Sequence, residues 1–493
     1  MASQTRTYKQ KKLLGQIYTP RHIVTKILHD TGFYEADLTN KTVLDPACGD
    51  GRFLVPIAEH IIQNANPETV TAQLENIYGW DIDKNALAEC RKNLDALIEP
   101  LGISVKWNLI HRNALAPLKR RKTFDFIIGN PPYIRIQHLE ITQRNFIQKH
   151  YSFCKNGSTD AYIAFFQLAS TLLNADGTCG FITPNGYLTS ETGKPLRSYF
   201  KENANLLRVT NYGSVPVFGN TATYSAITIF GKKRHNDFQF EQCTKITDDM
   251  DSRHISFADL DDIRPWQLSV KLPEHIEGVR LGDLCRISVG VTTLADPLFL
   301  FTIVGEKNDL LLAKSKQGIE IYLEKEILKP IIKASKIKHS DEPINEHILF
   351  PYQKDESGKQ RIIPENVMRE QFPHTFSYLF KVKPALDRRD NGKVNAVAWY
   401  AFGRAQSLDT SFGEKIVFSP MNLMPNFVYA QNPDTTVYSG YFIKYDGDYQ
   451  ALLRQLNSPR MAEFIAVAGR DFQGGYKGYN KKIVENFIIT LPV

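Results

Sequence analysis

The first 240 residues alternate short apolar runs with helical patterns, and this alternation constrains the fold more than any other feature. Residues 41–51 form a predicted buried strand that enters a Gly-rich turn, and residues 52–63 carry apolar side chains at helical spacing. Residues 76–83 and 85–98 repeat the pair. Further strands are predicted at 104–110, 123–130, 177–188 and 226–231, with an apolar helix at 160–174. Strands alternating with helices of this length predict an α/β domain with a doubly wound, mostly parallel sheet.

The chain of 493 residues is too long for one core of ordinary size. Charge divides it further: residues 1–240 carry a net +8, residues 241–280 a net −4 and residues 281–493 a net +3. We therefore expect a catalytic domain over 1–245, a linker over 246–280 and a second domain of mixed, irregular structure over 281–493. Two basic parts on either side of an acidic linker suit a protein that faces a polyanion, although a simple solubility imbalance gives the same numbers.

The distribution of apolar residues and cysteines points to the cytoplasm. The apolar runs are shorter than the ~18 residues of a membrane span, and the polar, basic N-terminal residues do not resemble a secretory signal. The six cysteines are scattered, without CxxC pairs or metal-ligand spacing. We expect reduced thiols, no metal and no membrane association.

A Gly-rich loop follows the first predicted strand in "LDPACGDGRFL", residues 44–54. In open α/β sheets, ligands bind beyond the carboxyl ends of the strands, where strand order reverses. Gly49 and Gly51 allow a tight turn there, and Asp45 offers an acceptor for an ammonium group. Acidic residues around the loop disfavour a pyrophosphate, so a zwitterionic ligand with an amine is expected. A Gly-rich turn without a ligand is the alternative.

An acidic residue, Asp81, ends the second predicted strand in "YGWDID". An acidic side chain at this position can bind both hydroxyls of a ribose. Asp83 can instead cap the helix that follows. Together with the Gly-rich loop, Asp81 indicates a nucleoside ligand.

A stiff corner, Asn130-Pro131-Pro132-Tyr133, ends the strand "FDFIIG". The Asn130 side-chain oxygen and the Pro131 carbonyl are two acceptors, which match the two hydrogens of an amino group. Tyr133 can lie against a planar ring. The corner is therefore predicted to hold the exocyclic amine of a base, and a purely structural proline turn is the alternative.

These motifs resemble the gamma-class N6-adenine DNA methyltransferases of restriction–modification systems, especially Taq-type enzymes with a C-terminal specificity domain. "GQIYTP", "DPACGDGRFL", "GWDID" and "NPPY" look like their motifs X, I, II and IV, in the order of that class. "DAYIAFFQLA" and "GFITPNGYL" look like motifs V and VI, and "VFGNTATYSAITIF" like motif VIII. The resemblance covers roughly residues 12–235. It implies the class I S-adenosylmethionine-dependent methyltransferase fold and site-specific methylation of adenine in duplex DNA.

The resemblance also implies roles for single residues. Asn130, Pro131, Pro132 and Tyr133 would form the catalytic corner, and Tyr133 and Phe218 would sandwich a flipped target base. S-adenosyl-L-methionine would contact Tyr18, Thr19, Asp45, Pro46, Ala47, Cys48, Gly49, Gly51, Asp81, Ile82, Asn113, Ala114 and Asn130. Asn113 is a departure, because the family usually has an acidic residue there. The mechanism implied needs no metal, because the rigid acceptors would localise the lone pair of the adenine amine.

The C-terminal part is expected to recognise DNA. Basic, aromatic and Gly-rich loops suit contacts with phosphates and grooves, although each loop alone is equally compatible with an ordinary solvated surface. The predicted DNA-binding residues are Arg388, Arg389, Lys393, Arg404, Arg470, Lys477 and Lys481. We expect the chain to be a modification component, with a cognate restriction endonuclease for the same site on a separate polypeptide.

Two alternatives stay open. The same corner occurs in enzymes that methylate RNA adenine or protein glutamine, but the long C-terminal part favours duplex DNA. A non-catalytic DNA-binding subunit on a degenerate methyltransferase fold is the second alternative, and the intact corner and Gly-rich loop argue against it.

Overall fold

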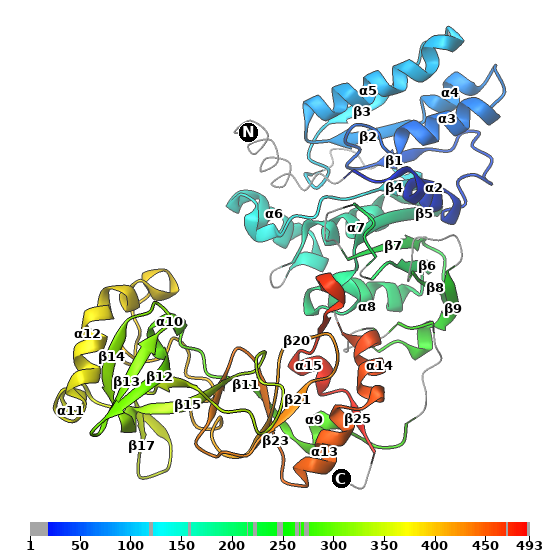
Figure 1. Cartoon of the computed structure of the whole chain (residues 1–493). Helices are drawn as coiled ribbons and strands as arrows, with labels where there is room; N and C mark the ends of the chain where they lie inside the picture. The colour runs from blue at the N-terminus through cyan, green and yellow to red at the C-terminus, as the bar shows by residue number, and fades with distance from the viewer. Residues whose placement is uncertain are drawn as a thin grey trace. The chain divides into compact units, whose positions relative to one another are not determined.

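The computed structural model describes residues 18–117, 122–155, 159–213, 215–219, 224–243, 250–261, 266, 268–270, 276–469 and 472–490. The chain divides into two compact units, residues 1–273 with 471–473, and residues 274–470 with 474–493 (Figure 1).

A nine-stranded sheet forms the centre of the first unit. Its strand order is β3-β2-β1-β4-β5-β7-β6-β8-β9. The strands are β1 (Val43–Asp45), β2 (Ile77–Asp81), β3 (Asn108–His111), β4 (Phe124–Gly129), β5 (Leu173–Pro184), β6 (Leu206–Asn211), β7 (Ser225–Phe230), β8 (Asp237–Gln242) and β9 (Asp251–Ser256). The strands from β3 to β5 are parallel, whereas β7 runs antiparallel between β5 and β6. The predicted mostly parallel sheet is thus observed.

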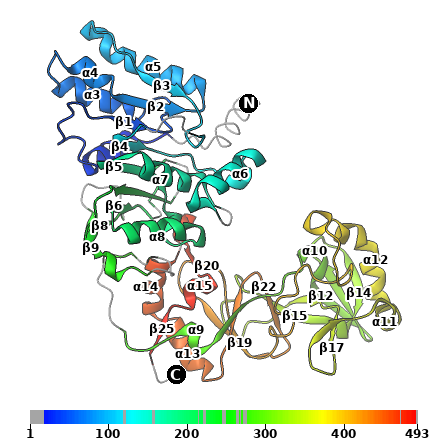
Figure 2. The same ribbon diagram turned by 180° about the vertical axis from the view of Figure 1, so that it is seen from behind.

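Helices cover both faces of this sheet (Figures 1 and 2). They are α2 (Arg21–Asp30), α3 (Leu54–Asn64), α4 (Val70–Leu74), α5 (Lys84–Ile98), α6 (Ile141–His150), α7 (Ala161–Leu172) and α8 (Lys194–Asn203). Successive strand side chains point to opposite faces, so Val43 packs in the core with α2, α3 and α5, while Leu44 packs with α7 and α8. The sheet therefore lies between two apolar cores.

Strand order reverses between β1 and β4, because the chain moves outward through β2 and β3 and then returns to the other side of β1. Because of this reversal, the connections that follow β1 and β4 lead to helices on opposite sides of the sheet. The reversal leaves room beyond the carboxyl ends of both strands, where the Gly-rich loop and the Asn-Pro-Pro-Tyr corner lie.

The predicted linker differs from the structure over part of its length. Strand β9, within residues 246–280, pairs antiparallel with all six residues of β8 and belongs to the sheet. Ile255 and Phe257 are buried in the same core as α7. The acidic composition of this segment is compatible with a strand at the edge of a sheet, where outward side chains are solvated.

The second unit has two larger sheets, with strand orders β14-β13-β12-β16-β15-β22 and β11-β23-β19-β21, and three two-stranded pairs (Figure 2). The strands are β10 (Val279–Arg280), β11 (Arg286–Val289), β12 (Leu300–Lys307), β13 (Leu310–Ser315), β14 (Glu320–Glu324), β15 (Leu328–Lys333), β16 (Glu346–Leu349), β17 (Tyr352–Lys354), β18 (Gln360–Ile362), β19 (Lys415–Phe418), β20 (Met421–Asn422), β21 (Phe427–Ala430), β22 (Thr436–Tyr438), β23 (Tyr441–Lys444), β24 (Lys477–Gly478) and β25 (Ile488–Ile489). The helices are α9 (Leu281–Leu284), α10 (Asp296–Phe299), α11 (Glu365–Gln371), α12 (Pro373–Asp387), α13 (Tyr449–Leu456), α14 (Pro459–Ala468) and α15 (Lys481–Val484).

Candidate functional site

The Gly-rich loop after β1 holds a buried carboxylate. Asp45 is only 2% exposed, and its Oδ1 accepts a hydrogen bond from the Ala47 N–H at 3.0 Å. A Cβ on Gly129 would lie 2.6 Å from that oxygen, so glycine at the end of β4 makes room for the carboxylate. Burial, and secondarily the negative charge of Asp81, raises the pKa of Asp45 to about 8. A cation beside Asp45 would relieve this cost of burial.

Positive backbone angles shape the loop. Gly49 and Gly51 have φ angles of +55° and +92°, which side-chain-bearing residues rarely adopt. A Cβ on Gly51 would also lie 2.9 Å from the Cys90 Sγ on α5. The Cys48 N–H donates to the Trp80 carbonyl at 3.0 Å, which ties the loop to β2.

Asp81 braces the same loop from β2. Its Oδ2 accepts from the Gly49 N–H at 2.9 Å, and its Oδ1 accepts from the Asp83 N–H at 2.8 Å. Asp83 caps α5 by accepting from the Asn85 N–H at 2.9 Å. The neighbouring Ile82 side chain is 54% exposed and provides an apolar surface beside Asp81.

The corner after β4 faces the segment before α2. The Asn130 side-chain nitrogen donates to the Thr19 hydroxyl at 3.0 Å, so the side-chain oxygen is the acceptor of this amide. Thr19 is buried, whereas Tyr18 is half-exposed with the Arg52 guanidinium 4.9 Å above its ring. Segments more than 100 residues apart in sequence thereby orient one amide.

Tyr133 and Phe218, the predicted base-stacking pair, lie together. Their ring centroids are 6.3 Å apart with planes at 69°, so the rings meet edge to face. The Tyr133 hydroxyl donates to the Ile182 carbonyl at 3.2 Å. Burial raises the pKa of Tyr133 well above its ordinary value, which keeps the phenol neutral. Parallel stacking on a base would require at least one ring to turn.

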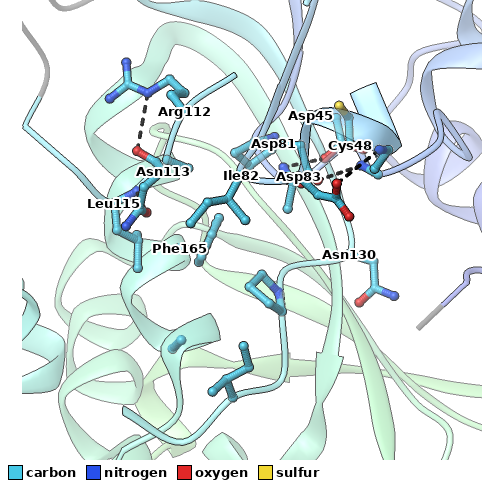
Figure 3. Close-up of a pocket in the computed structure, with 18 of the residues that line it drawn as sticks. Asp45, Cys48, Asp81, Ile82, Asp83, Arg112, Asn113, Leu115, Asn130 and Phe165 are labelled. Carbon is cyan, nitrogen blue, oxygen red and sulfur yellow. Dashed lines mark hydrogen bonds between the residues drawn. The ribbon is translucent and has the colours of Figure 1, made fainter. Parts of the chain in front are cut away.

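A cavity of about 840 Å³ borders the Gly-rich loop, the end of β2 and the Asn130 corner (Figure 3). Most of the predicted cofactor residues line it, namely Tyr18, Thr19, Asp45, Pro46, Ala47, Cys48, Gly49, Asp81, Ile82, Asn113, Ala114 and Asn130. Pro132 lines it as well. The predicted residues Gly51, Pro131, Tyr133 and Phe218 are not among its lining residues. Gly51 instead lies against Cys90 of α5.

Other lining residues were not predicted. Arg112, Leu115, Phe146 and Phe165 border the cavity, and Figure 3 shows Phe165 near Ile82. The motif "DAYIAFFQLA" contained Phe165, but its uniformly apolar helix gave no sign of which aromatic ring faces the site. Phe146 lies on α6, which no sequence motif marked.

Asn113 stands where the resembling family usually has an acidic residue. Its Oδ1 accepts from the Leu115 N–H at 3.0 Å, which closes a local turn beside the cavity. The Arg112 guanidinium lies 4.6 Å from the Trp80 ring and donates to the Ala116 carbonyl at 3.2 Å. These contacts hold the loop after β3 against β2.

The predicted DNA-binding residues of the second unit have differing surroundings. Arg388, Lys393 and Arg404 are exposed, and Arg404 pairs with Asp390 at 3.1 Å. The Arg389 guanidinium donates to the carbonyls of residues 293, 386, 399 and 401 at 2.8–3.3 Å, which gives it a structural role. Lys477 donates to a carbonyl at 3.3 Å, and Lys481 lies 3.6 Å from Glu485. Arg470 lies outside the described residues.

Among the residues that the structure describes, we find no cluster of metal-ligating side chains. No helix in the same part of the chain is long and apolar enough to cross a membrane.

Comparison with known proteins supports the reading of the motifs. Residues 75–218 match the Eco57I restriction-modification methylase family. The chain is 24% identical over 483 residues to the type II restriction enzyme and methyltransferase RM.Eco57I of Escherichia coli, covering 80% of this chain and 48% of that protein. It is 25% identical over 448 residues to the type II methyltransferase M.BanIII of Aneurinibacillus aneurinilyticus, covering 78% of this chain and 72% of the relative. The resemblance to restriction–modification methyltransferases is thus confirmed.

A solved structure extends the comparison to the fold. The type IIL restriction-modification enzyme MmeI, in complex with DNA, superposes with a TM-score of 0.64 at 14% identity over 94% of this chain and 63% of MmeI. Together with the strand order, this likeness confirms the class I methyltransferase fold of the first unit. The chain spans about half the length of RM.Eco57I.

Proposed function

We propose that this protein is a site-specific DNA adenine N6-methyltransferase that uses S-adenosyl-L-methionine and serves as a modification component of a restriction–modification system. One observation carries the proposal. The buried carboxylate of Asp45 and the oriented amide of Asn130 border the same cavity, although they follow different strands. A site for an amine-bearing cofactor therefore adjoins a site for a target amine.

The cavity fits S-adenosylmethionine. Asp45 is buried with a raised pKa, and the α-ammonium of the cofactor would compensate its charge. Asp81, which lines the cavity, would bind the ribose hydroxyls, and the exposed Ile82 would provide an apolar surface for the adenine. A volume of about 840 Å³ accommodates a ligand of this size. Bound there, the cofactor would supply an activated methyl group on a sulfonium.

Asn130 and Pro131 would act on the target amine. The Asn130 side-chain oxygen and the Pro131 carbonyl would accept its two hydrogens, which favours a pyramidal nitrogen with a localised lone pair. Thr19 holds the Asn130 amide in the orientation that presents oxygen as the acceptor. Preorganised acceptors of this kind stabilise the transition state without a general base. Tyr133 is buried and its phenol stays neutral, so it is not needed as a base and can serve as a stacking ring.

The target base has to leave the duplex to reach this corner. Tyr133 and Phe218 would stack on it, recovering about 1–3 kcal/mol for each stacked face. The two rings lie edge to face with centroids 6.3 Å apart. Turning one ring would make the pair parallel, so that a base could insert between them.

The second unit would bind duplex DNA through exposed cations. Arg388, Lys393 and Arg404 are the leading candidates for phosphate contacts, followed by Lys477 of β24 and Lys481 of α15. Arg470, which lies outside the described residues, remains a candidate from the sequence. We propose a cytoplasmic protein that acts in one system with a restriction endonuclease activity directed at the same DNA site.

The experiment is a methyl-transfer assay with labelled S-adenosylmethionine on duplex DNA, RNA and protein, followed by mass spectrometry of the digested product. We expect N6-methyladenine from duplex DNA. Asn130→Ala should reduce turnover by at least about 100-fold while cofactor binding is retained. Label in RNA or in glutamine would refute the DNA assignment. Lack of cofactor binding by the wild type would indicate the non-catalytic alternative.

A further inference from the structure

The short ribbon of β20 and β24 presents an apolar surface to solvent. Its pairs are Met421 with Gly478 and Asn422 with Lys477, in antiparallel register. Side chains alternate along a strand, so Met421 and Asn422 point to opposite sides of β20, and Leu423 follows directly after the strand. Asn422 is 8% exposed, whereas Met421 is 43% and Leu423 is 52% exposed. The apolar side of the ribbon is thus its outer side.

The tip of the ribbon extends this surface. Met424 is 63% and Tyr476 is 39% exposed. A Cβ on Gly475 would lie 3.7 Å from the Leu423 Cδ2, so the two loops meet at the tip. Gly474 and Gly475 have φ angles of +79° and +81°, and the absence of side chains there leaves backbone able to approach a partner closely. We call Met421, Leu423, Met424 and Tyr476 the tip cluster.

The base of the ribbon is anchored in a core. Tyr479 is 1% exposed, and its N–H donates to the Pro420 carbonyl at 2.8 Å. Ile483 and Val484 of α15 pack in the same apolar cluster. A firm base under an exposed apolar tip distinguishes this element from a frayed loop, and contiguous exposed apolar side chains mark interaction surfaces.

Charge around the tip selects the partner. Residues 474–485 contain Lys477, Lys481 and Lys482 and one acidic residue, Glu485, which lies 3.6 Å from Lys481, so the net charge is +2. Residues 419–426 carry no charged side chain. The cationic flank complements the phosphates of a polyanion. The uncharged apolar and aromatic tip complements an interior of stacked, apolar rings, and duplex nucleic acid has both properties.

We propose that the tip cluster contacts the bases of duplex DNA, while Lys481 and Lys482 at its side contact phosphates. This inference rests on the proposed function, because it names the element that meets the interior of the DNA. The two contact types differ in their salt dependence. Each phosphate contact adds about 0.9 to the slope of log affinity against log salt, whereas an apolar contact adds nothing.

The test compares the full chain with two serine triple variants in DNA-binding titrations at several salt concentrations, using short duplexes of random sequence. The first variant is Leu423→Ser, Met424→Ser and Tyr476→Ser. The control is Val304→Ser, Ile319→Ser and Tyr322→Ser, which removes three residues that are 41–48% exposed elsewhere in the same unit. We expect the tip variant to bind at least roughly tenfold more weakly with an unchanged salt slope, and the control to bind like the wild type.

The paired charge variant Lys481→Gln with Lys482→Gln should lower the slope by about 2. Equal binding of tip variant and wild type would overturn the inference while leaving the proposed function intact. A tip variant with a reduced salt slope, or a wild type whose tip-dependent behaviour is self-association in sedimentation velocity, would overturn it as well. Failure of the wild type to bind any duplex would instead refute the proposed function.

Discussion

Replacing Asp45 with Asn should remove the part of the pH dependence of cofactor affinity that comes from the Asp45 carboxyl group. The wild-type pKa is about 8, so at pH 7 only about one Asp45 in ten is ionised before the cofactor binds. Ionising it costs about 1.4 kcal/mol at pH 7 and about twice that at pH 6. Wild-type affinity should therefore lose up to about tenfold for each pH unit below 8.

The ratio of wild-type to Asp45→Asn affinity reports the contact between Asp45 and the cofactor, because protonation of the free cofactor contributes equally to both affinities. A charge-assisted contact in a buried site contributes about 1.5–3 kcal/mol. We expect a ratio of about 10–100 near pH 8, where an ionised Asp45 and a protonated α-amine are both available, that falls toward unity at pH 6. Isothermal titration calorimetry in buffers of different ionisation enthalpy should also detect a proton released by the wild type near pH 7. A ratio that stays flat from pH 6 to pH 9 would refute the reasoning.

The same pKa shift affects stability in a definite direction. The folded pKa of Asp45 lies above the ordinary value of 3.8, so between about pH 4 and pH 8 the folded state holds a proton that the unfolded chain has released. The free energy of unfolding should therefore fall as pH rises through that window. Asp45→Asn should remove this contribution, which denaturant unfolding at pH 5 and pH 8.5 can measure.

Five further substitutions, at Gly129, at Arg388 and Arg389, and at Tyr133, test other parts of the structure. Gly129→Ala would place a Cβ 2.6 Å from the Asp45 carboxylate, so we expect at least about tenfold weaker cofactor binding by calorimetry, and unchanged binding would contradict the packing argument. Arg389→Ala should cost about 2–4 kcal/mol in denaturant unfolding, since its guanidinium donates to four carbonyls. Arg388→Ala should change stability by less than about 0.5 kcal/mol and weaken DNA binding, and the reverse pattern would exchange their roles. Tyr133→Phe removes one 3.2 Å hydrogen bond and should keep turnover within about threefold, whereas Tyr133→Ala should lose at least about tenfold in the methyl-transfer assay; equal activities would exclude stacking by this ring.

The sequence determined the elements that carry the site. Strand and helix periods placed β1, β2 and β4, and glycines at 49 and 51 required a turn with positive φ angles. Because parallel strands present their carboxyl ends at one edge, Asp45, Asp81 and Asn130 could be expected to lie near each other. These are local properties, set by the backbone preferences of a few neighbouring residues.

Contacts between distant segments were decided by the tertiary structure. The hydrogen bond from Asn130 to Thr19, the room that Gly129 leaves for Asp45, and the wall that α6 adds to the cavity follow from packing. The acidic segment predicted as linker supplied strand β9, because an edge strand tolerates charged outward side chains.

The second unit shows the same division most clearly. Basic residues could be counted from the sequence, but the sequence does not distinguish the roles of the adjacent arginines Arg388 and Arg389. Arg389 turns inward to backbone carbonyls while Arg388 stays exposed, and only the folded chain separates a structural cation from a solvated one. Composition and the periodicity of apolar residues are properties of short segments of sequence. Burial and hydrogen-bond partners instead depend on residues far apart along the chain.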